Sequence, residues 1–153
     1  MTKANVFKYE NRLAKSLVTK GGMTASEAIR TATAAVEQVR QPTLNEIDAT
    51  LREIYELGER LRAGADPEAL RAMYAAGNRV VAMAGVFGLA ELGQAAYSLC
   101  ELISRLQTSE RHNWRMIEVH LDGLRLLRAP DEHSPEHRQA VLAGLRQVAT
   151  SIG

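Results

Sequence analysis

Apolar residues recur at helical spacing through most of this 153-residue chain, and its four prolines fall between the repeating segments. One apolar stripe is formed by Leu44, Ile47, Leu51, Ile54 and Leu61. No segment shows the sustained alternation of polar and apolar residues that marks a half-buried strand. Leucine, alanine, arginine and glutamate, all good helix formers, dominate the sequence. These features predict an all-α protein.

Capping residues predict where the helices begin. The predicted N-caps are Thr24, Thr43, Asp66 and Ser134. Thr24 and Thr43 are each followed three residues later by glutamate, which makes a capping box. Asp66 and Ser134 each precede a proline, which suits the first helical position. An earlier helix is expected over about residues 5–18, and others after the Phe87-Gly88 corner and around Trp114.

Short connections between these helices predict antiparallel neighbours, so the expected fold is an antiparallel bundle of four or more helices. The restart after Pro42 separates two N-terminal helices from the remainder. We therefore expect an N-terminal helical appendage at residues 1–41 and a helical bundle at residues 42–153. The length of the chain favours one domain, with or without such an appendage.

Composition excludes several classes of protein. Apolar residues make up 46% and charged residues 24%, as in ordinary soluble globular proteins, and the formal charge of +1 lacks the basic footprint of a nucleic-acid binder. The single cysteine, Cys100, lies in an apolar helical pattern and is expected to be a buried thiol. Neither a signal peptide nor a membrane-spanning run is evident, so the cytoplasm is the expected compartment.

The most unusual stretch runs from Gly77 to Cys100, where only Arg79 and Glu91 carry charge. On a helical wheel, the predicted core face carries Met73, Ala76, Val80, Met83, Ala84 and Phe87. The opposite face, centred on Asn78, is also small and largely apolar. A helix with two apolar faces is either buried on both or presents one to another molecule. Either the N-terminal helices cover the Asn78 face, or it is a docking surface.

The run AAGNRVVAMAGVFGLAELGQAAYSLCELI resembles the signature region of histidine phosphotransfer (HPt) proteins, a helix reading A-H-x-x-K-G-x-x-G-x-F-G followed by a leucine-rich helix. The resemblance extends over about residues 44–127 and is strongest over 75–106. Gly85 matches the second glycine of the motif, and Phe87-Gly88 match its phenylalanine-glycine corner. Asn78 stands where the motif has the phosphorylatable histidine, Val81 where it has lysine, and Ala82 where it has the first glycine.

These departures bear directly on chemistry. In the family, a histidine nitrogen attacks the aspartyl phosphate of a receiver domain, and the lysine helps to hold the phosphoryl oxygens. The lone pair of a carboxamide nitrogen is delocalised, so Asn78 cannot act as that nucleophile, and Val81 has no charge. The resemblance therefore implies an HPt-type bundle that has no catalytic residue, cofactor or metal and is not an enzyme.

The resemblance further implies a signalling protein that docks a two-component partner, either a receiver domain or the dimerisation region of a histidine kinase. The expected partner-binding residues all lie on the Asn78 face: Arg71, Tyr74, Asn78, Val81, Ala82 and Gly85. Neither a nucleic acid nor a membrane is an expected partner.

Other interpretations stay open from the sequence. His120, beside an apolar stripe, could be a displaced phosphorylation site, although a histidine in that setting is more often packed. His133 and His137 have a spacing that suits a metal on a helix, but Pro135 lies between them and no third ligand is evident. The N-terminal helices could also pair two chains into a homodimer, which would make the protein a structural module.

Overall fold

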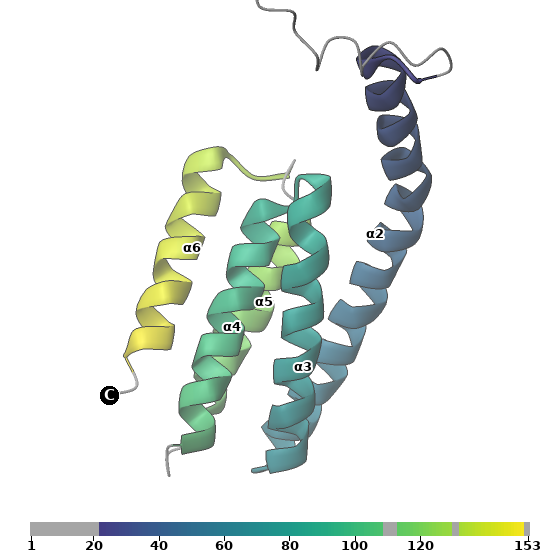
Figure 1. Cartoon of the computed structure of the whole chain (residues 1–153). Coiled ribbons are helices and arrows are strands. Elements are labelled where there is room, and N and C mark those ends of the chain that lie inside the picture. The colour runs from purple at the N-terminus through teal and green to yellow at the C-terminus, as the bar shows by residue number, and fades with distance from the viewer. Residues whose placement is uncertain (1–21, 109–112, 130–131, 152–153) are drawn as a thin grey trace, which may run out of the picture. The chain divides into compact units, whose positions relative to one another are not determined.

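The computed structural model describes residues 22–108, 113–129 and 132–151 (Figure 1). Their elements, in chain order, are α2 (Ala25–Ala63), α3 (Pro67–Ala84), the 3-10 turn η1 (Gly85–Phe87), α4 (Ala90–Thr108), α5 (Trp114–Arg128) and α6 (Pro135–Thr150). The described residues contain no strand, which confirms the all-α prediction for this part of the chain. The helix predicted over residues 5–18 lies outside it. Among the helices described, none is both long and apolar enough to span a bilayer.

Three of the predicted helix starts are confirmed by their capping hydrogen bonds. Before α2, the Thr24 backbone N–H donates to Glu27 Oε2 at 2.8 Å, and the Glu27 N–H donates to Thr24 Oγ1 at 3.2 Å, which is a complete capping box. Asp66 caps α3 by accepting the Ala69 N–H at 2.9 Å. Ser134 caps α6 in the same way. Local sequence was sufficient here because each cap contacts only its own first turn.

The predicted helix start at Thr43 is wrong, because α2 continues through Pro42 without a break. Proline cannot donate a hydrogen bond to the carbonyl of Gln38, so the helix loses one backbone bond at this point. The Thr43 hydroxyl instead donates back to the Val39 carbonyl at 2.8 Å, as helix-interior threonines do. The residues that follow hold the helix in place, since Ile47 and other side chains of this part of α2 are buried in the core.

The chain divides into two compact units, Met1–Gln38 and Val39–Gly153, so α2 runs from the first unit into the second. Within the second unit, a single apolar cluster joins residues 39–63 of α2 to α3, α4, α5 and α6. The largest fully buried side chains include Ile47, Ile54, Met73, Leu92, Leu99, Leu102, Ile103, Leu124 and Leu142. Helix α4 packs against α3, α5 and α6, and Figure 1 shows it between α3 and α6.

Charged side chains tie neighbouring helices together around this core. Arg128 of α5 forms two hydrogen bonds with Asp48 of α2, Nε to Oδ1 at 2.7 Å and Nη2 to Oδ2 at 3.1 Å. Arg138 of α6 contacts Glu91 of α4 at 2.5 Å. Both pairs are part-buried and join helices that are far apart in the sequence, so they help to set how these helices are aligned.

The predicted Phe87-Gly88 corner is confirmed, and it sets α4 against α3. Gly88 has a φ of 79°, in the left-handed region that side chains disfavour, which explains the glycine at this position. The Leu89 N–H donates to the Ala84 carbonyl at 3.1 Å and closes the turn. Phe87, the last residue of η1, is buried with 9% of its surface exposed.

Candidate functional site

The two faces that the sequence predicts for α3 are separated in the structure as expected. On the core face, Met73, Ala76, Val80 and Ala84 are fully buried. On the opposite face, Arg71, Tyr74, Asn78, Ala82 and Gly85 are exposed and Val81 is half-buried. All six predicted partner-binding residues therefore lie on one accessible side of α3 and η1 within the unit Val39–Gly153. We call this side the α3 face.

Asn78 lies near the centre of the α3 face, and its amide is held by the helix itself. The Nδ2 atom donates to the Tyr74 carbonyl, one turn earlier, at 3.0 Å. This bond leaves the Oδ1 atom as an acceptor on the exposed side of the helix. A carboxamide neither titrates nor attacks phosphorus at physiological pH, so the side chain can serve only as a hydrogen-bonding group.

Beneath Asn78, helices α3 and α4 approach each other closely at Gly77 and Cys100. A Cβ atom built on Gly77 would lie 2.6 Å from Cys100 Sγ, so only glycine allows this approach. The thiol is buried and points its Sγ at the Tyr74 carbonyl, 3.6 Å away. Burial raises the pKa of Cys100 to about 11, so the thiol stays protonated at neutral pH. Cys100 is a packing residue, as its apolar sequence context predicts.

Helix α4 supplies the other wall of a polar hollow beside Asn78. The hollow has a volume of about 420 Å³ and is lined by Tyr74, Asn78, Tyr97, Cys100, Glu101, Ser104 and Arg105. Arg105 and Glu101 form an ion pair across one helical turn at 2.9 Å. Tyr97 is the residue that sequence reasoning missed, and it is 64% exposed. Its position off the Leu92, Ala96, Leu99, Ile103 stripe was the signal that could have identified it.

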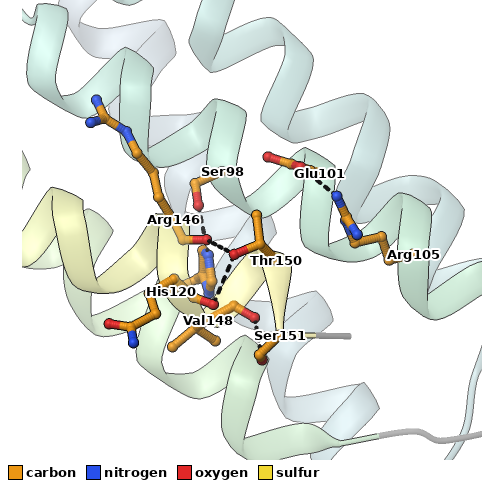
Figure 2. A network of polar contacts seen from close by, with 9 residues as sticks. Ser98, Glu101, Arg105, His120, Arg146, Val148, Thr150 and Ser151 are labelled. Carbon is orange, nitrogen blue, oxygen red and sulfur yellow. Dashed lines mark hydrogen bonds and ion pairs between the residues drawn. The ribbon is translucent and has the colours of Figure 1, made fainter. Parts of the chain in front are cut away.

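His120 lies in the interior and is fully buried. Its Nδ1 atom is 2.8 Å from the Met116 carbonyl, which can only accept, so Nδ1 carries the proton and donates. The Nε2 atom then accepts from the Ser98 hydroxyl at 3.0 Å (Figure 2). Burial lowers the pKa of His120, against the opposing effect of nearby backbone carbonyls. Both ring nitrogens form hydrogen bonds inside the protein, so His120 is a packed interior residue rather than an accessible one.

We expect this buried imidazole to make stability depend on pH. The unfolded chain takes up a proton on His120 below about pH 6.5, whereas the folded chain resists protonation because its pKa is lower. The free energy of unfolding should therefore be highest above that pH and fall below it by up to about 1.4 kcal/mol per pH unit, until the folded-state pKa is reached. Urea unfolding from pH 7.5 to 5 measures this slope.

The matched variant is His120→Gln. The glutamine amide supplies one donor and one acceptor, as the two ring nitrogens of histidine do, but it does not titrate. The difference between the two proteins isolates the histidine from the carboxylates, which titrate at lower pH. Equal slopes in the two proteins between pH 6.5 and 5 would contradict the assignment of this pH dependence to His120.

The two other histidines that the structure describes, His133 and His137, belong to no cluster of potential metal ligands within the described residues. Their rings meet edge to face, with centroids 5.3 Å apart. His112 lies outside those residues. Comparisons with protein-family models, with curated proteins and with solved structures found no match to this chain.

Proposed function

We propose that this chain is a cytoplasmic HPt-like signalling protein that binds a two-component partner without transferring phosphate. In this proposal, an HPt-type four-helix bundle within residues 42–153 presents the α3 face to a receiver domain or to the dimerisation region of a histidine kinase. The protein then modulates or bridges that partner. The proposal draws on the resemblance of residues 75–106 to the HPt signature.

The observation that carries the proposal is the exposure of Asn78 at the position where that signature has its histidine. An exposed amide among small residues suits a surface that a partner approaches closely, and it lacks the nucleophile that transfer requires. The buried state of His120 argues against the alternative, since a receiver's phosphoryl group has no open path to either ring nitrogen.

The composition of the surface around Asn78 also supports docking. Ala82 and Gly85 leave the helix backbone accessible, so a partner loop or helix can come near. Tyr74 and Tyr97, 41% and 64% exposed, flank the polar hollow from α3 and α4. Exposed tyrosines are enriched in protein interfaces because they combine apolar area with a hydrogen-bonding hydroxyl.

A binding and labelling experiment tests the proposal. The purified chain is mixed with receiver domains and kinase dimerisation regions from the same organism, each with and without phosphorylation, and both complex formation and phosphate on the chain are measured. We expect a saturable complex with at least one partner and no phosphate on the chain. Label on the natural chain would contradict the non-catalytic proposal, and absence of binding across the panel would contradict docking.

The double variant Asn78→His/Val81→Lys extends this experiment. Because position 78 is exposed, the new imidazole is accessible, and we expect acid-labile phosphate on this variant from the receiver that binds the natural chain. Adding His120→Gln to the variant should leave the label in place. Loss of label on that addition would identify His120 as the phosphorylated residue.

A further inference from the structure

A second, apolar groove lies along α4 and shares Val81 and Gly85 with the α3 face, and its volume is about 520 Å³. Its lining includes Val81, Gly85, Ala90, Gly93, Tyr97 and Arg146. The lining is mostly apolar, and the volume falls in the range of about 300–1,000 Å³ that small-molecule sites occupy. We call it the α4 groove.

Two glycines make the α4 groove hollow, and neither is required by its backbone conformation. Among the described glycines only Gly88 has a positive φ, so a side chain at Gly85 or Gly93 would be conformationally acceptable. A Cβ on Gly85 would meet nothing within 4 Å, and one on Gly93 would approach Ala84 Cβ at 3.4 Å. The space above Gly85 is therefore open rather than filled by the fold.

Arg146 of α6 brings a positive charge to this apolar surface. Its Nη2 atom donates to Gln94 Oε1 of α4 at 2.6 Å, which holds the guanidinium across from α6 to α4. Figure 2 shows the long Arg146 side chain extending from α6 past Ser98. Gln94 is neutral, and among the described residues no carboxylate lies within ion-pair distance of Arg146. Glu101, which also lines the groove, is paired with Arg105 at 2.9 Å.

An apolar hollow beside a cation that forms no ion pair with any described carboxylate is complementary to one class of ligand. We propose that the α4 groove binds a small amphipathic anion, a carboxylate or sulfonate attached to an apolar chain or ring. The anionic group bonds to the guanidinium of Arg146, and the apolar part lies over Gly85 and Gly93 beside the ring of Tyr97. Charge-assisted bonds from arginine orient the anion, while the burial of apolar area supplies affinity.

The test uses the full-length chain and two probes, decanoate in calorimetry and 1-anilinonaphthalene-8-sulfonate in fluorescence. We expect one saturable site at which decanoate displaces the fluorescent probe. The Arg146→Gln variant should weaken decanoate binding about tenfold or more, because a hydrogen-bonded charge pair is lost. The Ala90→Leu variant should weaken it by filling the groove. Arg125→Gln, an exposed arginine of α5 outside the groove, should bind decanoate as the natural chain does.

Circular dichroism melting of each variant confirms that the fold is retained. Unchanged decanoate affinity in Arg146→Gln and Ala90→Leu, or no saturable binding of either probe at millimolar concentration, would overturn the proposal. The result is independent of any protein partner. Ala82 does not line the groove, so Ala82→Arg should keep decanoate binding even where it prevents protein docking.

Discussion

A receiver domain or kinase region that binds the natural chain should bind the Ala82→Arg variant about 100-fold more weakly or worse. Ala82 is exposed on the α3 face, one turn from Asn78 and nearly one turn from Gly85. Arginine there places a long, charged side chain across the small surface that the proposed partner has to approach. Titration calorimetry with the partner identified in the binding panel measures the loss.

Ala140→Arg is the matched control, because Ala140 is also an exposed alanine inside a helix, in α6, and it lines neither hollow. Both variants add one positive charge, so a purely long-range electrostatic effect would change their affinities for the partner by the same amount. Gly85→Arg repeats the test at the other end of the α3 face, where an added Cβ meets nothing within 4 Å. Equal affinities of Ala82→Arg and Ala140→Arg would exclude the α3 face as the binding surface.

The second large effect is expected from Gly77→Ala, which should lower the free energy of unfolding by up to about 2 kcal/mol, because an overpacking cost of about 1–3 kcal/mol is partly offset by the better helix propensity of alanine. The new methyl group would lie 2.6 Å from Cys100 Sγ, so α3 and α4 have to separate or the thiol has to leave its position near the Tyr74 carbonyl. This cost exceeds the gain of up to about 1 kcal/mol that alanine brings to a helix interior. Urea unfolding at neutral pH measures the change.

A double-mutant cycle separates this clash from other effects of the substitution. In Gly77→Ala/Cys100→Ala the sulfur is removed, so the combined variant should be more stable than the sum of the two single changes predicts. Gly85→Ala is the neutral comparison, since its added methyl group meets nothing. Additive single changes in the cycle would show that Gly77 and Cys100 do not limit the approach of α3 and α4.

Much of the fold could be predicted because its signals are local. The caps at Thr24, Asp66 and Ser134 and the corner at Gly88 each depend on residues within one turn. The error at Pro42 has a matching cause. A proline removes one backbone bond, but the burial of side chains further along α2 outweighs that local loss.

The candidate site was predicted in part for the same reason. A helical wheel relates residues of one helix, so it placed five of the six residues of the α3 face on the exposed side, whereas Val81 is half-buried and packs against the core. It could not relate α3 to its neighbours. The packing of α4 and α6 beside α3 therefore decides that Tyr97 and Arg146 line the hollows next to it, and a helical wheel of α3 does not include them.

The sequence by itself determined the helices, most of their ends, and which side of each helix is apolar, because hydrogen bonding within a turn and a period of 3.6 residues decide these. Tertiary structure alone decided that Gly77 meets Cys100, that His120 is buried with both nitrogens bonded, and that Arg146 reaches Gln94. Each of these contacts joins residues more than 20 positions apart or depends on burial between helices. Their geometry follows from how the helices pack, and no local pattern encodes it.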